Sequence, residues 1–361
     1  MTLSAPAILA RAAQLCATFE AAGALRVETD VLQPADRLLD LYGEDIRGRA
    51  YVTRDPSDAE MMLRPDFTVP VVLQHMQGGA EPARYAYSGK VFRRQESDPD
   101  RPREYVQVGY EVFDRSNPAE TDAEVFAVLS DAVAGAGLRP VTGDLGILMA
   151  AIDGLATTER RKAALRRHIW RPARFRALLD RFGGRADVPA ARAALVAGDI
   201  SPPEAPLIGL RAQDEVDERI AALRADAAEP PLTRQEMELF DLLLSVTGAL
   251  PDALGALQAL VARMPTLASA VGRLADRSDA LAARGCDVSG LEFQATFGRT
   301  TMEYYDGFVF GLFAPDADGS PPVVSGGRYD ALTAQLGQGQ SIPAVGGIIR
   351  PDLLVAAEVA T

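Results

Sequence analysis

The sequence contains very few of the residues that usually carry metal, disulfide or covalent chemistry. Its 361 residues include two cysteines, Cys16 and Cys286, and two histidines, His75 and His168. None of them falls in the spacing of a zinc site, so we expect no metal. Two isolated cysteines form no disulfide framework, which favours a reducing, cytoplasmic setting.

Long apolar runs are also missing. No stretch approaches the roughly 20 apolar residues that cross a bilayer, and the first residues lack the basic start and apolar core of a secretory signal. Lysine is nearly absent, since Lys90 and Lys162 are the only two, and the net charge is −13. Nucleic-acid backbones bind clustered basic residues. The sequence therefore predicts no membrane association and no nucleic-acid partner.

The usual nucleotide-binding loops are absent as well. Gly89 and Lys90 are followed by Val91 and lack the upstream glycine of a Walker A loop, and no Gly-x-Gly-x-x-Gly follows a first strand. We therefore expect no cofactor. Hydrophobic content of 48% and charged content of 24% are normal for a globular protein with a sizeable core.

Apolar periodicity divides the chain into three parts. Residues 6–22 show helical spacing, residues 24–115 look like strands and turns, and residues 150–285 are typical of successive helices. A capping box at 121–124 predicts a helix that ends near Gly135. Later strands are predicted at 291–297, 303–313, 323–325 and 344–349, with helices at 329–336 and 351–359. The simplest architecture is one α/β domain over residues 1–361, with a mostly helical insert at 150–285.

Two predicted strands, joined by a charged loop, carry the most informative pattern. Along residues 103–113 side chains alternate, so the valines and Tyr110 point to a core, whereas Gln107 and Glu111 share the opposite face. Gly109 lies between these two polar residues and removes a side chain that would fill the space. A small polar ligand would fit this cleared patch. The alternative is a solvated face of an antiparallel sheet.

Several segments together resemble the catalytic core of histidyl-tRNA synthetase, a class II aminoacyl-tRNA synthetase. Their order and spacing are specific, although each is weak alone. The resemblance covers residues 5–150 and 290–355. It implies a mixed α/β (α+β) fold with an antiparallel sheet flanked by helices, and a homodimer formed through the first motif at 24–42. The segments are Leu-Arg-Pro-Asp-Phe-Thr at 63–68, Val-Phe-Arg at 91–93, Gln-Val-Gly-Tyr-Glu-Val-Phe at 107–113, Tyr-Tyr at 304–305, Ser-Gly-Gly-Arg-Tyr-Asp at 325–330 and Pro-Ala-Val-Gly-Gly at 343–347.

The resemblance implies a histidine-binding pocket. Asp66, Thr68 and Gln107 would hold the α-amino group, while Glu111 and Tyr305 would pair with the two imidazole nitrogens. A carboxylate and a phenol at opposite ends of an imidazole select histidine because both ring nitrogens are satisfied. The other implied site residues are Arg93, which would face a carboxylate or phosphate, and Tyr304 and Tyr329, which line the pocket.

The chain departs from the synthetases where histidine is activated. Thr300 replaces the arginine that drives activation, and Arg299 is one position early. A one-residue slip would turn Arg299 to the opposite face of a strand, although a turn could return it to the pocket. Leu353 replaces the arginine that clamps ATP. The sequence also ends soon after this motif, so we expect no anticodon-binding domain.

This combination resembles the regulatory subunits of ATP phosphoribosyltransferase, paralogues of the synthetase. The resemblance implies a non-catalytic subunit that partners a short-form catalytic subunit, with L-histidine as effector, in a hetero-oligomer built from dimers and expected to be a hetero-octamer. One alternative is a minimal histidyl-adenylate-forming enzyme or truncated histidyl-tRNA synthetase, which requires Arg299 to point into the pocket. Another is an amino-acid-binding module without a partner.

Overall fold

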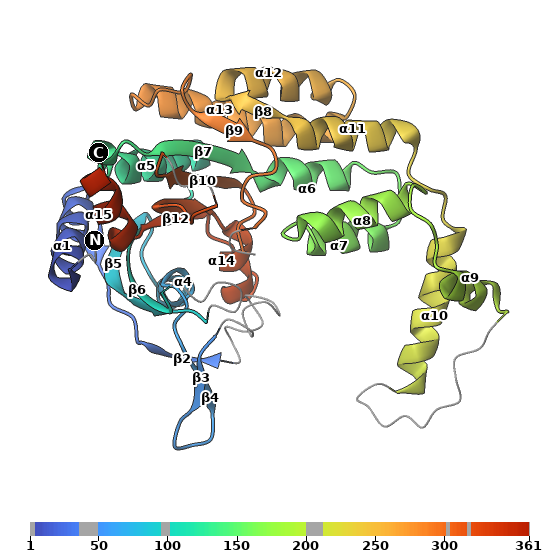
Figure 1. Cartoon of the computed structure of the whole chain (residues 1–361), viewed down its shortest axis with the longest axis horizontal. Coiled ribbons are helices and arrows are strands. Elements are labelled where there is room, and N and C mark those ends of the chain that lie inside the picture. Colours follow the sequence, from blue (N-terminus) through green and yellow to red (C-terminus); the bar gives the residue numbers. More distant parts are fainter. Residues whose placement is uncertain are drawn as a thin grey trace.

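The computed structural model describes residues 4–35, 50–94, 102–199, 212–300, 304–315 and 319–360. A nine-stranded sheet forms its centre (Figure 1). The strand order is β1 (Leu25–Arg26), β5 (Ala83–Phe92), β6 (Glu104–Phe113), β12 (Ala344–Ile349), β11 (Val324–Arg328), β10 (Phe308–Phe313), β7 (Arg139–Asp144), β9 (Glu292–Gln294) and β8 (Thr247–Ala249). The strands from β5 to β7 pair antiparallel, whereas β1 joins β5 and β9 joins β7 in parallel.

Helices cover both faces of this sheet. On one face, the even-numbered residues of β6 from Val106 to Val112 pack in a core with helices that include α1 (Ala5–Ala21), α5 (Pro118–Asp131), α13 (Ala268–Ala283) and α15 (Pro351–Ala360). The other face packs in a second core with α4 (Thr68–Met76) and α14 (Asp330–Leu336). Because both faces are covered, β6 is buried from Tyr105 to Phe113. The solvated-face alternative is therefore wrong.

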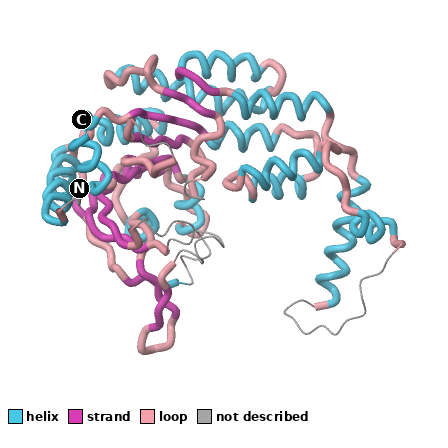
Figure 2. The backbone as a smooth tube through the Cα atoms, in the orientation of Figure 1, coloured by secondary structure: helices cyan, strands magenta, loops and turns pink. Residues whose placement is uncertain are grey.

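The chain between β7 and β9 is mainly helical (Figure 2). Its α9 (Ala190–Ala197) and α10 (Gln213–Ala228) pack on each other away from the sheet and bury no side chain. Among the described residues, no helix has both the length and the apolar character that a bilayer crossing requires. The described part of this segment also contains α13 and, before it, α6 (Leu145–Asp153), α7 (Glu159–Arg167), α8 (Pro172–Phe182), α11 (Arg234–Ser245), α12 (Leu250–Val261) and the 3₁₀ turn η2 (Pro265–Leu267).

A separate three-stranded sheet lies beside this body. Its order is β2 (Leu32–Pro34), β4 (Glu60–Leu63) and β3 (Val52–Arg54). The first motif was predicted at 24–42, and its second half lies outside the described residues.

Several predicted elements are wrong. Residues 24–115 contain the helix α4 as well as strands and turns, and the strand expected at 323–325 covers Val324–Arg328. Helix α5 begins at Pro118 and is capped by the Asn117 side chain, whereas the Thr121 hydroxyl donates back to main-chain carbonyls. The strand expected at 291–297 covers only Glu292–Gln294. The strand expected from 303 begins at Phe308, because Asp306 turns away to accept hydrogen bonds from the first backbone N–H groups of α14.

Buried charges tie the helices to the sheet. Arg277 on α13 donates to Asp122 at 3.0 Å and to Asp144 at 2.6 Å, and all three side chains are buried. Arg328 on β11 donates to the same Asp122. One guanidinium thus compensates two carboxylates that desolvation would otherwise penalise.

Replacing Arg277 by leucine should therefore destabilise the fold strongly. Asp144 would lose its buried cation, while Asp122 would keep its pair with Arg328. Breaking a buried pair typically costs about 3–5 kcal/mol. Urea unfolding would measure the change. The control is Arg234→Leu, because Arg234 pairs with Glu238 on an exposed face of α11, where an ion pair contributes little. An equal free energy of unfolding for both variants would show that the Arg277 ion pairs do not stabilise the fold.

Candidate functional site

The Glu111 carboxylate is the centre of a buried polar site. It lies on β6 with 1% of its surface exposed. Its Oε1 accepts hydrogen bonds from the Thr68 hydroxyl at 2.9 Å and the Tyr87 hydroxyl at 2.8 Å, and its Oε2 accepts one from Tyr329 at 2.6 Å. These donors come from α4, β5 and the residue before α14, so the site joins three elements.

Burial controls the protonation of this carboxyl group. Desolvation raises the pKa of Glu111 to about 7, and the nearby Asp66 carboxylate adds to the rise. The three hydroxyl donors act in the opposite direction because they favour the ionised form. Burial and the Glu111 charge also raise the pKa of Tyr87 and Tyr329 well above the ordinary value, so both phenols remain protonated donors.

Gly109 has a different role from the one predicted. A Cβ at this position would lie 2.1 Å from Cζ of Tyr87, and Tyr87 is the direct partner of Gly109 across the β5–β6 ladder. The space that Gly109 clears is therefore filled by the Tyr87 ring, and the prediction that it holds a ligand is wrong. Gly346 on β12 leaves space for the Glu111 side chain, because a Cβ there would lie 1.4 Å from Oε2.

Gln107 and Asp66 extend the polar surface beyond Glu111. Gln107 lies on the same face of β6, four residues earlier, and is 2% exposed. Its Oε1 has no hydrogen-bond partner among the described residues. Asp66 is also buried, just before α4, where its Oδ1 accepts from the Val69 backbone N–H at 3.4 Å.

Three tyrosines form the aromatic wall. The rings of Tyr304 and Tyr305 lie 4.9 Å apart, and those of Tyr304 and Tyr329 lie 6.0 Å apart, each pair edge to face. Burial and then the charge of Glu111 raise the pKa of Tyr305, which places this phenol in the electrostatic field of the carboxylate. All three rings belong to the core that covers this face of the sheet.

Arg93 lies at the edge of the site, directly after β5. Its Nε donates to the Pro65 carbonyl at 2.8 Å, beside Asp66, and its guanidinium lies 5.9 Å from the centre of the Tyr105 ring. The positive charge of Arg93 lowers the pKa of Tyr305, against the larger effect of burial. The structure thus brings together the eight residues predicted from the sequence around one buried face.

The residues at the departures from the synthetase point elsewhere. Arg299 is buried, and its Nε donates to the Ile169 carbonyl at 2.7 Å while its guanidinium lies 4.6 Å from the Phe175 ring. Both partners belong to the helical segment after β7. Thr300 is exposed, and Leu353 packs against the core on the opposite face of the sheet.

Tyr87 is the site residue that sequence reasoning missed. A signal was present, because a tyrosine directly across from a glycine in an antiparallel pair lies over the gap that the glycine leaves. The register that aligns Tyr87 with Gly109 depends on the loop between the strands, however, and loop length alone does not fix it.

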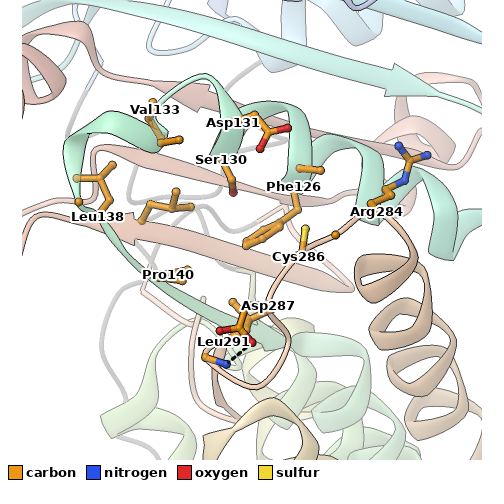
Figure 3. Close-up of a pocket in the computed structure, with 16 residues that line it drawn as sticks. Phe126, Ser130, Asp131, Val133, Leu138, Pro140, Arg284, Cys286, Asp287 and Leu291 are labelled. Carbon is orange, nitrogen blue, oxygen red and sulfur yellow. Dashed lines mark hydrogen bonds between the residues drawn. The ribbon is translucent and has the colours of Figure 1, made fainter.

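A cavity of about 400 Å³ lies away from this site, where α5 and η1 (Ala134–Ala136) meet the loop after α13 (Figure 3). Phe126, Leu138 and Leu291 supply apolar walls, and Cys286 and Arg284 border it. None of the predicted site residues lines this cavity. Across the described ranges, no group of three or more His, Cys, Asp or Glu side chains is arranged to hold a metal ion.

Comparison with solved structures defines the class of fold. A crystal structure described as an ATP phosphoribosyltransferase regulatory subunit/histidyl-tRNA synthetase from Bacillus halodurans matches with a TM-score of 0.69 at 21% identity, over 99% of this chain and 81% of that one. A histidine–tRNA ligase subunit from Alicyclobacillus acidocaldarius matches with a TM-score of 0.63 at 24% identity, over 100% and 96%. The fold is that of the class II, histidyl-tRNA synthetase-like proteins, as predicted.

Sequence relatives narrow this class. The histidyl-tRNA synthetase family profile matches residues 4–225 and 212–354. ATP phosphoribosyltransferase regulatory subunits from Rhizobium rhizogenes and Mesorhizobium japonicum are each 31% identical, covering 97% and 99% of this chain and 98% of each relative. One from Rhizobium etli is 32% identical over 92% of this chain and 93% of the relative. The chain belongs to the ATP phosphoribosyltransferase regulatory subunit family.

Substituting Gly109 by alanine should disturb the site through Tyr87. The added methyl group would occupy the ring's position, and such overpacking typically costs about 1–3 kcal/mol. Thermal or urea unfolding would measure the loss. Gly272→Ala is the matched control, since a Cβ there meets nothing within 4 Å on helix α13. That variant should gain up to about 1 kcal/mol from helix propensity. Equal effects at the two positions would contradict the packing argument.

Proposed function

We propose that this chain is a non-catalytic, histidine-sensing regulatory subunit of ATP phosphoribosyltransferase, the first enzyme of L-histidine biosynthesis. It would be required for activity of a short-form catalytic subunit and would transmit feedback inhibition by histidine. Membership in the family supports the regulatory role. The composition of the buried site around Glu111 supports histidine as the effector.

The observation that carries this proposal is the Oε1 atom of Gln107. A buried polar atom without a hydrogen bond is costly and therefore uncommon. This one lies on the same strand face as Glu111 in a site rich in acceptors. The α-ammonium group of an amino acid supplies the missing donors. Asp66 adds a carboxylate nearby. Thr68, the first residue of α4, adds a hydroxyl group that donates to Glu111.

The ring end of the ligand would lie between Glu111 and Tyr305. A carboxylate offers about four lone-pair sites, and hydroxyl donors fill three of those on Glu111. The remaining site suits one imidazole N–H. The Tyr305 phenol, which is hydrogen-bonded to Tyr304, would face the other ring nitrogen, with Tyr304 and Tyr329 enclosing the ring. Arg93 at the rim would pair with the carboxylate of histidine.

The positions of Arg299 and Leu353 support the non-catalytic part of the proposal. Adenylate formation places charge on phosphates, and cations must stabilise it in the transition state. Arg299 is instead held by Ile169 and Phe175, and Leu353 packs in the core on the other face. The adenylate-forming alternative requires Arg299 to point into the pocket. The contacts of Arg299 do not support that requirement.

The partner assembly is proposed on surface composition. Large apolar side chains are exposed on β1, just before β2, on β2 and on β3, at Leu25, Val31, Leu32 and Val52. Leu25, Val31 and Leu32 belong to the first motif, and exposed apolar surface marks interaction sites in many proteins. We propose that it forms a homodimer contact, and that such dimers join the catalytic subunits in a hetero-octamer. Histidine would then regulate the complex by binding one assembly state more tightly than the other.

Glu111→Gln should weaken histidine binding at least about tenfold, or about 1.4 kcal/mol, because the charged acceptor becomes a neutral amide. Isothermal titration of histidine into the isolated chain would measure the affinity. The control is Glu238→Gln on the exposed face of α11, which should bind normally. Unchanged affinity in Glu111→Gln would exclude this pocket as the effector site.

Activity assays would test the regulatory role. The chain, mixed with a short-form catalytic subunit, should co-elute with it and raise its phosphoribosyltransferase activity, and histidine should reverse the gain. The isolated chain should show no histidine-dependent ATP–pyrophosphate exchange, since Arg299 is held away from the pocket. Measurable exchange would overturn the non-catalytic assignment, and failure to associate with the catalytic subunit would overturn the partner assignment.

A further inference from the structure

Tyr87 holds a position that the function proposed above does not use. It lies on β5, its side chain is fully buried, and its ring stacks on Phe67 with centroids 4.5 Å apart. On its other side the ring occupies the space over Gly109. The ring therefore has little freedom to move, and its hydroxyl is fixed 2.8 Å from Oε1 of Glu111.

The charges around Glu111 make this hydroxyl important. Each hydrogen bond that Glu111 receives from the described residues comes from a neutral hydroxyl group. Asp66, before α4, is a second negative charge that disfavours ionisation. Tyr305, before β10, is a buried neutral phenol, and the positive charge of Arg93 acts on that phenol from the rim. Among the described residues, these hydroxyl donors are therefore the groups that favour the ionised form of Glu111.

The donors are distributed unevenly over the two carboxylate oxygens. Thr68 and Tyr87 both donate to Oε1, which fills its two lone pairs, whereas Oε2 receives only Tyr329. A ligand N–H can therefore reach only Oε2, next to Tyr329. Removing the Tyr87 hydroxyl would open a second acceptor position on Oε1 and would leave the carboxylate with one donor fewer.

We propose that Tyr87 is a positioning residue, which favours the ionised form of Glu111 and restricts ligand binding to Oε2. This inference rests on the proposed histidine pocket. Tyr87 does not touch the ligand itself. It determines whether Glu111 is an acceptor, and so it makes the site selective for a ring that carries an N–H donor.

The test is proton release on ligand binding to Tyr87→Phe, which keeps the ring and its stacking. The ligand is 1,2,4-triazolylalanine, a histidine analogue whose ring has an N–H but stays neutral near pH 7. Calorimetry in two buffers with different ionisation enthalpies gives the number of protons released. With the pKa of Glu111 at about 7, the unaltered chain should release about half a proton at pH 7.

In Tyr87→Phe the carboxyl group loses a donor to its charged form, so its pKa rises further. Release at pH 7 should then approach one proton, and affinity should fall about tenfold, consistent with loss of a hydrogen bond to a charged group. The affinity should recover as the pH is raised above 8, where a growing fraction of Glu111 is ionised. A role in packing alone would change neither the proton count nor the pH profile.

Two further variants fix the interpretation. Tyr85→Phe is the matched control, because Tyr85 lies on the same face of β5 but its hydroxyl bonds His75 at 3.0 Å and not Glu111. Its proton count should equal that of the unaltered chain. Thr68→Val removes the other donor to Oε1 and should shift the count in the same direction as Tyr87→Phe, which keeps the test decisive if Tyr87→Phe fails to fold.

The outcomes separate the two proposals. If the unaltered chain binds the analogue and Tyr87→Phe has the same proton count and affinity, Tyr87 has no positioning role and the inference is overturned, while the pocket stands. If the unaltered chain binds neither histidine nor the analogue, the proposed pocket is wrong and the inference falls with it. A raised proton count in Tyr87→Phe and Thr68→Val, but not in Tyr85→Phe, supports both.

Discussion

The burial of one carboxyl group, Glu111, in a sheet covered on both faces is the constraint on which this site depends. Burial favours the neutral form of Glu111, and this desolvation raises its pKa to about 7. Hydroxyl groups from three elements oppose it. The strands and helices that carry Thr68, Tyr87 and Tyr329 are therefore linked through one functional group as well as through their apolar contacts.

Glycines opposite the large polar side chains make this arrangement possible. Tyr87 faces Gly109 across one ladder, and Glu111 faces Gly346 across the next. In each pair an added Cβ would collide with the partner. The sheet accommodates a phenol and a carboxylate in one layer because the facing positions on the neighbouring strands are glycines. These are packing requirements, and they replace the ligand space that the sequence predicted at Gly109.

The sequence predicted the class of fold, and its grouping of the candidate site residues has a physical reason. Strand alternation places Gln107 and Glu111 on one face wherever the strand lies, and the resemblance supplies their companions from distant segments. It did not predict what lies opposite that face, because burial depends on helices α4 and α14 and on the β5–β6 register. The start of α5 was misplaced for a related reason. Asn117 and Thr121 both have capping side chains, and Pro118 fits the first helical turn, so the earlier cap prevails.

The orientation of Arg299 connects the chemistry of the pocket to its proposed use. Catalysis needs groups that bind the transition state better than the substrate, and a guanidinium near the ligand carboxylate would act in that way. Here Arg299 donates a hydrogen bond to the Ile169 carbonyl and makes a cation–π contact with Phe175. It therefore links the helical segment after β7 to the chain near Arg299. The charges left beside the tyrosines are the carboxylates of Asp66 and Glu111, with Arg93 at the rim. In the proposed function, such a set would bind an amino acid in its ground state, as a sensor requires. An adenylating enzyme must in addition stabilise a transition state.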